Sequence, residues 1–552
     1  MRILVKNARI ADGTGKDLFD GAVLIEDERI AAVFHGPASY AAEDAAPAAG
    51  SPAGNAVPVD VERSADRVID AGGHVCAPGF IDTHSHSDLK VLSEPSLLPK
   101  LHQGITTEVL GQDGISMAPL PEAYIGPWQK NLAGLDGTDV TLDWHYGNVD
   151  GYFNLLEKAG PALNEAYLLP HGNIRMEAMG LENRPADEKD LEKMREITVR
   201  EMEAGCIGVS SGLIYMPCAY GKTEELIEIC KVAASYGGVF VVHQRSEADT
   251  ILPSMDEIIR IGRESGIPIH FSHFKVCGKP NWKYLDGMFE KLDQAEKEGL
   301  TVSFDQYPYV AGSTMLGVIL PPWAHDGGTE QLLKRLSSNS DRARMKEDIA
   351  KGIPGWDNFI EFAGTEGIYI TSVLSEKNQD AVGMSLDELG EKRGKEPLEA
   401  AFDLLLEEKN AVGMVDFYGT EDHVKAIMKR PEMNLCTDGL LSGKPHPRVY
   451  GAFPRLLGKY VREEKCLTLP EAVRKMTGKA ADALHLKDRG YIKEGYFADL
   501  TIFDPETVKD CGTFEKPDVY PTGIETVIVN GHVALEHGEV SAERRGKVLR
   551  RK

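Results

Sequence analysis

The chain has 552 residues, of which 42% are hydrophobic and 27% charged, and its formal net charge is -25. This length exceeds one small domain, and the composition is that of an ordinary globular protein. The acidic excess argues against nucleic acid and anionic membranes as partners. Eight cysteines lie far apart without a C-x-x-C pair, and no apolar run is long enough to span a bilayer. These features favour a reduced, cytoplasmic protein.

The two ends of the chain carry strand patterns. Residues 1–75 contain short apolar runs punctuated by glycine and aspartate, which is typical of hairpins in a small antiparallel sheet. Within them, residues 39–65 are rich in alanine, proline and glycine and predict a mobile surface loop. Residues 486–552 return to strands, at 498–503 and 525–529. We therefore expect one small β-sandwich domain built from both termini.

Residues 76–485 alternate apolar runs with amphipathic helical stretches, the pattern of repeated βα units. Eight runs are found, centred on residues 80–81, 106–110, 166–169, 207–210, 239–242, 267–272, 301–304 and 433–436. They predict an α/β fold of the (β/α)8 TIM-barrel type. The gap between the seventh and eighth runs is too long for one helix. Residues 314–430 are therefore expected to form an insertion or lid over the mouth of the barrel.

Candidate metal ligands fall where a barrel places its functional side chains, at the C-terminal ends of the strands. His84 and His86 share a face because alternate residues of a strand point the same way. The candidates in chain order are His84 and His86 after the first strand, Asp113 after the second, His243 after the fifth, His273 after the sixth and Asp438 after the eighth. Imidazoles and carboxylates converging on one mouth suit one or two zinc ions, or another divalent metal.

The same ends carry groups suited to hydrolysis of an anionic substrate. Zinc lowers the pKa of a bound water to about 7, and Asp438 is placed to take its proton and pass it to a leaving nitrogen. Arginine offers a fork that matches a carboxylate. The further polar side chains expected at the mouth are Lys275, Arg448, Tyr215, Tyr307 and Ser313.

Several motifs resemble a known family. Residues 78–86, PGFIDTHSH, resemble the first-strand signature of the amidohydrolase superfamily, and residues 490–500, GYIKEGYFADL, resemble its return to the β-sandwich. More narrowly, five stretches are similar to the D-aminoacylase, or N-acyl-D-amino-acid deacylase, family: 114–120, 210–215, 272–275, 307–313 and 446–448. The matches run from about residue 1 to residue 504.

The resemblance implies zinc-dependent hydrolysis of the amide bond of a small N-acyl-D-amino acid, which releases a carboxylate and a free D-amino acid. It implies Asp438 as general acid and base. The residues that match the family's metal ligands are His84, His86, His243 and His273. Those that match its substrate groups are Lys275, Arg448 and Tyr215 for the carboxylate, and Tyr307 and Ser313 for the scissile carbonyl, where a tyrosine hydroxyl would donate to the oxyanion.

One departure and two alternatives remain open at this point. Asp113 stands where the best-known members have a cysteine ligand, and a carboxylate is a harder, weaker zinc donor than a thiolate. Asp113 therefore leaves open whether the site binds one metal ion or two. A cyclic amidohydrolase of the hydantoinase or dihydroorotase type would use a carboxylated lysine from the fourth strand, but residues 206–211 read CIGVSS. A non-catalytic metal-binding barrel would be expected to have lost the acid/base, and Asp438 is present.

Overall fold

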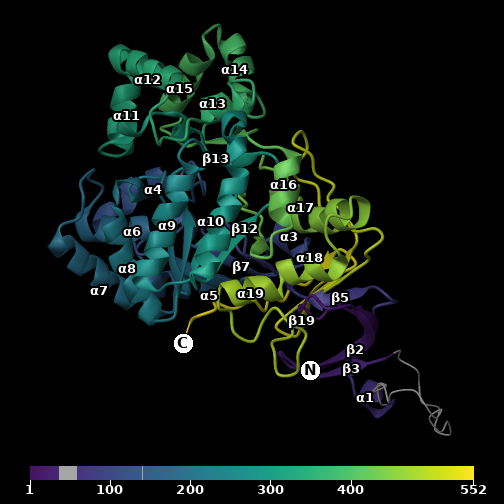
Figure 1. The fold of residues 1–552 in the computed structure, drawn as a ribbon. Helices are drawn as coiled ribbons and strands as arrows, with labels where there is room; N and C mark the ends of the chain where they lie inside the picture. The colour runs from purple at the N-terminus through teal and green to yellow at the C-terminus, as the bar shows by residue number, and fades with distance from the viewer. Residues whose placement is uncertain (37–58, 140, 552) are drawn as a thin grey trace.

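The centre of the molecule is a barrel of eight parallel strands (Figure 1). The computed structural model describes residues 1–36, 59–139 and 141–551. The barrel strands are β6 (Phe80–Asp82), β7 (Ile105–Leu110), β8 (Asn164–Pro170), β9 (Gly208–Gly212), β10 (Val239–His243), β11 (Ile269–Phe271), β12 (Val302–Gln306) and β16 (Met433–Leu435). Each is hydrogen-bonded to the next in this order. The predicted (β/α)8 barrel is confirmed, and each of its eight strands overlaps one of the eight apolar runs.

The seam between the first and last strands is closed by the residues that follow them. Asp438 N donates to His84 O at 2.8 Å, and His86 N donates to Gly439 O at 3.3 Å. Ser85 and Gly439 form a parallel bridge. The C-terminal ends of β6 and β16 are thereby held side by side, together with the polar side chains that follow each strand.

Helices cover the outside of the barrel because each has an apolar stripe that packs on the strands. In α9 (Ile251–Ser265) the buried residues include Ile251, Met255 and Ile258, which repeat at the spacing of one helix face. α7 (Glu188–Ala204) begins with a capping box between Asp187 and Asp190. Other helices of this layer are α5 (Val149–Ala159), α8 (Thr223–Ser235), α10 (Leu285–Lys297), α18 (Leu469–Met476) and α19 (Gly478–Ala483).

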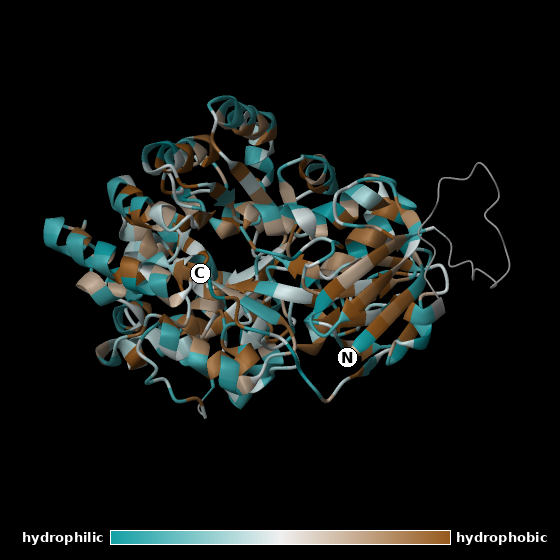
Figure 2. Ribbon diagram, turned by 90° about the horizontal axis from the view of Figure 1, so that it is seen from below, coloured by the Kyte–Doolittle hydropathy of each residue, from teal (hydrophilic) through white to brown (hydrophobic). Residues whose placement is uncertain are grey.

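The strands of both chain ends form one sheet of nine strands beside the barrel. They are β1 (Arg2–Ile10), β2 (Phe19–Glu26), β3 (Arg29–His35), β4 (Arg67–Asp70), β5 (Val75–Pro78), β17 (Leu500–Phe503), β18 (Ile524–Val529), β19 (His532–Glu536) and β20 (Glu539–Val540). The two ends join where β5 pairs antiparallel with β17, with Cys76 opposite Ile502. These strands are largely hydrophobic (Figure 2). The predicted β domain assembled from both termini is confirmed.

The loop expected over residues 39–65 lies mostly outside the described residues. Its C-terminal part contains a short helix, α1 (Val59–Arg63), and Ser64 and Ala65 follow it. No helix in the described ranges is both long enough and apolar enough to cross a membrane.

The insertion is a compact unit standing at one end of the barrel (Figure 1). Its sheet has three antiparallel strands, β13 (Gly312–Met315), β15 (Val412–Asp416) and β14 (Ile368–Val373). Its helices are α11 (Thr329–Leu336), α12 (Asn339–Lys351), α13 (Phe359–Ala363), α14 (Leu386–Arg393) and α15 (Pro397–Glu407). Leu332, Phe402 and Met414 belong to a hydrophobic cluster of its own. Because β13 follows the C-terminal end of β12, the unit lies at the mouth of the barrel, and α16 (Glu421–Met428) leads back to β16.

Candidate metal centre

All the predicted ligands come together at the mouth. His84 and His86 follow β6, Asp113 lies in the turn after β7, His243 ends β10, His273 follows β11 and Asp438 follows β16. Each is at most 5% exposed. Three of them, Asp113, His273 and Asp438, have positive φ angles of 53°, 34° and 47°. Non-glycine residues seldom adopt this conformation, and such strained positions cluster at functional sites.

The turn that carries Asp113 is shaped by two glycines. Gly111 and Gly114 both have positive φ, and a Cβ on Gly111 would meet the Leu168 carbonyl oxygen at 2.1 Å. The chain therefore passes close against β8 and returns the Asp113 carboxylate toward the barrel axis. Glycine permits both the backbone conformation and the close approach.

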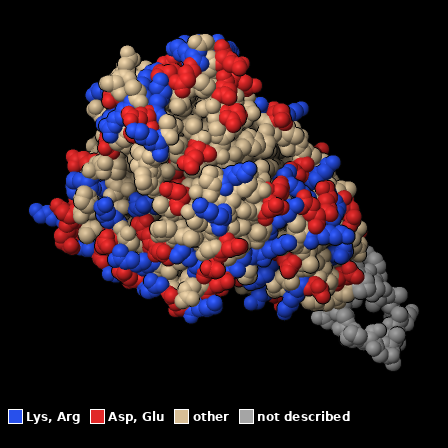
Figure 3. All heavy atoms as spheres, turned by 45° about the horizontal axis from the view of Figure 1, so that its top comes forward, with Lys and Arg blue, Asp and Glu red and all other residues tan. Residues whose placement is uncertain are grey.

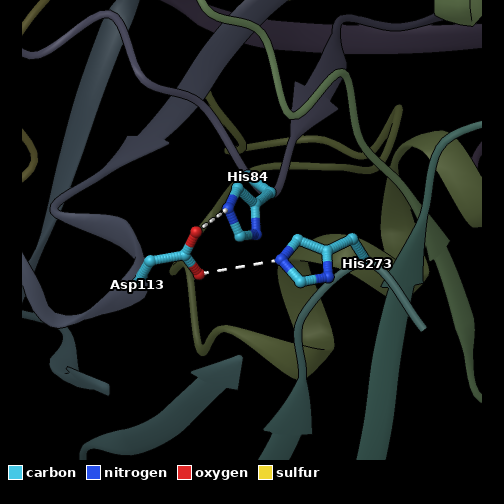
Figure 4. Close-up of side chains that lie close together, drawn as sticks. All are labelled: His84, Asp113 and His273. Carbon is cyan, nitrogen blue, oxygen red and sulfur yellow. Dashed lines mark ion pairs between the residues drawn. The ribbon is translucent and has the colours of Figure 1, made fainter. Parts of the chain in front are cut away.

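The Asp113 carboxylate lies among three imidazoles, of which Figure 4 draws those of His84 and His273. Its Oδ2 is 3.6 Å from His84 Nε2 and 3.5 Å from His86 Nε2, and its Oδ1 is 3.8 Å from His273 Nε2. Although burial opposes ionisation, the charges on His84 and its neighbours hold the pKa of Asp113 well below its usual range. This carboxylate is thus ionised and is placed to bind one metal ion or to bridge two.

Asp438 approaches the same imidazoles from the last strand. Its Oδ1 is 3.3 Å from His86 Nε2 and 3.7 Å from His84 Nε2, and its Oδ2 is 2.9 Å from Arg448 Nη1. The guanidinium of Arg448 is fully buried and lies 4.3 Å above the Tyr307 ring. Burial alone would raise the pKa of Asp438, but Arg448 and His84 lower it below its ordinary value. Asp438 is therefore a carboxylate able to accept a proton.

His243 and His273 form the opposite side of the centre. His243 Nδ1 lies 3.0 Å from His273 Nε2, and His273 Nδ1 lies 3.1 Å from Glu247 Oε1. The Lys275 ammonium is 2.6 Å from Glu247 Oε2 and 2.8 Å from His273 Nδ1. Glu247 was missed in the sequence, although its position four residues after His243 was a signal. Lys275, predicted to hold the substrate carboxylate, is paired with Glu247.

Asp305 is a second residue that sequence reasoning missed. It lies in β12, where its Oδ1 accepts from the His273 backbone N–H at 2.5 Å and its Oδ2 lies 3.0 Å from His270 Nε2. The same Oδ2 is 3.6 Å from His84 Nδ1. A carboxylate behind a metal-binding imidazole orients the ring and strengthens the donor. An aspartate near the C-terminal end of a barrel strand was the available signal.

The unpaired atoms of this cluster fit a metal ion. His84 Nε2, His243 Nε2 and Asp113 Oδ1 are buried and have no hydrogen-bond partner. Buried polar atoms seldom lack a partner. Burial would lower the pKa of His86, but Asp113 and Asp438 raise it to about 9. The negative charges of Asp113 and Asp438 thus stabilise a positive charge between them, which a divalent cation supplies. Four groups among the described residues satisfy ligand spacing: His84, Asp113 and His273; His84, His86 and Asp438; His243, Glu247 and His273; and His86, Asp88 and Asp136.

The predicted substrate groups surround this cluster. Tyr215, Tyr307, Ser313 and Lys275 line one cavity together with His86, Asp113 and other residues of the centre. The Tyr215 hydroxyl is 3.0 Å from Thr314 Oγ1, and the Tyr307 hydroxyl is 2.7 Å from the Tyr418 hydroxyl. The Ser313 hydroxyl donates to the Met414 carbonyl of β15 at 2.9 Å. The insertion therefore supplies part of the wall of the site.

Comparison with known proteins reveals close relatives. The amidohydrolase family model matches residues 67–335 and 384–535. A D-aminoacylase of Alcaligenes xylosoxydans xylosoxydans is 34% identical over 485 residues, which cover 88% of this chain and 89% of that protein. An N-acyl-D-glutamate deacylase of the same organism is 34% identical over 488 residues, which cover 88% of each chain.

A solved structure shares the whole fold. The crystal structure of an N-acyl-D-glutamate deacylase from Bordetella bronchiseptica, complexed with zinc and a phosphonate that mimics the tetrahedral intermediate, matches with a TM-score of 0.80. The two chains are 30% identical, and 99% of each is covered. The eight-stranded barrel and the imidazoles and carboxylates at its strand ends place this protein in the class of metal-binding barrels. The chain belongs to the amidohydrolase family, and the predicted resemblance to the D-aminoacylases within it is confirmed.

Proposed function

We propose that this protein hydrolyses the amide bond of N-acyl-D-amino acids and releases a carboxylate and a free D-amino acid. The observation that carries the proposal is the position of the Asp438 carboxylate, whose Oδ1 lies 3.7 Å from Nε2 of the candidate ligand His84 and 3.3 Å from Nε2 of His86. The relatives named D-aminoacylase and N-acyl-D-glutamate deacylase match the chain over most of its length and support the same reaction. Specificity for the D-isomer rests on these relatives.

Proton transfer in this proposal falls to Asp438. The ligands His84, His86, Asp113, His243 and His273 would hold one or two zinc ions, which lower the pKa of water to about 7. Asp438 takes the proton of the attacking water as general base, since Arg448 and His84 keep its carboxylate ionised. It then gives this proton to the leaving nitrogen as general acid.

The scissile carbonyl is assigned to Tyr307. The Tyr307 hydroxyl stands at the wall of the site cavity and is bonded to the Tyr418 hydroxyl. A donor that meets the developing oxyanion contributes about 2.7–4 kcal/mol to transition-state stabilisation. Because Ser313 donates to the Met414 carbonyl, we assign it to holding this wall in place.

The substrate carboxylate is assigned to Lys275, Tyr215 and Arg448. Lys275 and Tyr215 both line the site cavity. The Lys275 ammonium has three N–H donors and is already paired with Glu247, so a substrate carboxylate would share it with that residue. Arg448 is paired with Asp438, and its guanidinium lies over the Tyr307 ring. From there its positive charge would attract the substrate carboxylate.

The test of the proposal is a substrate panel with the zinc-loaded protein. The panel contains N-acetyl-D-amino acids, their L-isomers and cyclic amides, and Asp438→Asn serves as the matched control. Release of D-amino acids alone, lost in the control, supports the proposal. Ring opening would instead indicate a cyclic amidohydrolase. The absence of a lysine from β9 argues against that class, because such an enzyme would use a carboxylated lysine from this strand. Inactivity toward every substrate would indicate a metal-binding barrel without turnover.

The cellular setting that we propose is the cytoplasm. All eight cysteines are free, and six of them are buried. A reducing compartment suits such a protein. Its partner would be a small N-acyl amino acid, and the net charge of -25 disfavours nucleic acid.

A further inference from the structure

The turn of residues 111–114, here named the Asp113 turn, rests on one face of β9. The Ser210 hydroxyl of this strand donates to the Gly111 carbonyl oxygen at 2.5 Å and accepts from the Gly114 backbone N–H at 3.1 Å. A serine hydroxyl can do both because it is a donor and an acceptor at once. One buried side chain thus bridges the two ends of the turn.

The same face of β9 leaves room for the middle of the turn. Gly212 comes two residues after Ser210 and therefore lies on the same face of the strand. A Cβ on Gly212 would lie 2.3 Å from the carbonyl oxygen of Asp113, which is closer than real Cβ contacts come. Glycine at this position lets the turn lie directly against the strand. Ser211 points to the other face, where its hydroxyl is 3.0 Å from His171 Nδ1.

The backbone of Asp113 needs this support because its conformation is unfavourable. Asp113 has a φ of 53° and a ψ of 21°, in the left-handed region that non-glycine residues seldom adopt. A residue keeps such a conformation only where the surrounding structure holds it there. If Asp113 relaxed to the right-handed region, its carboxylate would leave the positions 3.6 Å from His84 Nε2 and 3.8 Å from His273 Nε2.

Two other side chains touch the ends of the turn, but each of them touches one end only. The Gly111 backbone N–H donates to Asp88 Oδ1 at 2.8 Å. The Cys218 thiol donates to the Gly114 carbonyl oxygen at 3.3 Å. Within the described ranges of the chain, Ser210 is the one side chain that is hydrogen-bonded to both ends. Loss of its hydroxyl would therefore free the two ends to move apart.

We propose that Ser210 is a positioning residue for the metal centre, whose hydroxyl holds the Asp113 turn in the conformation from which Asp113 reaches a zinc ion. This inference rests on the metal centre of the proposed function and needs no turnover. A carboxylate is a weaker zinc donor than a thiolate, so the affinity gained from Asp113 depends on its being held in place before the metal binds. The strand β9 then serves the metal centre without supplying a ligand.

The first experiment measures zinc binding to the metal-free protein, in competition with a chromophoric chelator. We expect Ser210→Ala to weaken zinc binding at the site that Asp113 serves by about 10–100-fold. The matched control is Ser211→Ala, which removes an equally buried hydroxyl from the same strand, one that bonds to His171 and not to the turn. The control should bind zinc as the parent protein does. Equal losses of zinc affinity in the two variants would overturn the inference.

Exposed carboxylates are a second source of zinc binding that the comparison must remove. On the face shown in Figure 3, acidic side chains are spread over the surface among basic ones. Zinc bound weakly by these groups is the same in both variants, and the comparison therefore cancels it. The measurement is repeated with Co²⁺, whose visible absorption depends on the geometry of its ligands. Ser210→Ala should shift this spectrum toward that of Asp113→Ala, and a spectrum identical to that of the parent protein would contradict the positioning role.

A double-mutant cycle tests whether Ser210 acts through Asp113. In the Asp113→Ala background, Ser210→Ala should cause no further loss of zinc affinity, because the carboxylate that it positions is gone. Independent losses that multiply would mean that the hydroxyl stabilises the barrel in general, and the inference would be wrong. If the parent protein binds no zinc, the metal centre of the proposed function fails and this inference fails with it. The zinc measurements decide the inference even if no N-acyl-D-amino acid is hydrolysed, in which case the proposed function alone fails.

Discussion

Lys100 provides the sharpest test of how the barrel positions the metal centre. It comes from the short helix α3 (Leu98–Leu101) and is fully buried. Its ammonium is 2.6 Å from Asp82 Oδ2, 2.8 Å from Ser85 Oγ and 2.7 Å from Thr437 Oγ1. Ser85 lies between His84 and His86, and Thr437 precedes Asp438. A single charge thus ties the first strand end to the last.

The loss of folding free energy expected on removing the Lys100 charge follows from the carboxylates that surround its ammonium. Although burial would lower the pKa of Lys100, Asp82 and Glu108 raise it above its ordinary value. Lys100→Met keeps most of the length of the side chain and leaves those two buried carboxylates without their cation. Removing one partner of a buried pair costs about 3–5 kcal/mol of folding free energy. The matched control is Lys130→Met, because Lys130 pairs with Glu330 at 3.0 Å on the surface, and should cost about 0–1 kcal/mol.

The assay is equilibrium urea unfolding followed by circular dichroism, with the zinc content of each variant measured in parallel. We expect Lys100→Met to unfold at a clearly lower urea concentration than Lys130→Met and to retain less zinc. Lys100→Met/Asp82→Asn should recover part of the loss, since one unpaired charge is removed. If Lys100→Met and Lys130→Met differ by less than about 1 kcal/mol, the idea that Lys100 holds the seam together is wrong.

Four further outcomes are expected at the metal centre itself. Asp438→Asn should lower kcat by about 10²–10⁴-fold with zinc content unchanged, and near-normal turnover would refute its acid/base role. His243→Ala should lose bound zinc, which metal analysis detects. Asp113→Ala should lower the number of zinc ions per chain, and an unchanged stoichiometry would show that it is not a ligand. Removal of metal by a chelator should abolish hydrolysis, and added zinc should restore it; activity that survives complete metal removal would exclude a metal-dependent reaction.

Much of the fold was predictable because the information for it is local. The eight apolar runs overlap β6 to β12 and β16, since buried parallel strands leave short continuous hydrophobic segments in a sequence. The residues just after those segments were predictable as site residues for the same reason. His84, His86, Asp113, His243, His273 and Asp438 all lie within four residues of a strand end. The barrel then brings them together.

The pairing among these groups could not be predicted in this way. Glu247 is 28 residues from Lys275 in the chain and Asp305 is 32 residues from His273, yet each pair is in contact. Arg448 and Lys275 were predicted to hold the substrate carboxylate, and the structure also pairs each with a carboxylate of the protein. Such partners are chosen by three-dimensional proximity, for which sequence spacing gives no rule.

The sequence by itself determined the kind of fold and the positions of the candidate ligands. The apolar runs mark the strands, and the polar residues that follow each run mark the strand ends. The tertiary structure alone decided how those ligands are charged and what lies beside them. Closure of the seam sets Asp438 against His86, and docking of the insertion completes the wall of the site cavity next to Tyr215. Both depend on contacts between segments far apart in sequence, where burial removes water and gives each charge its partner.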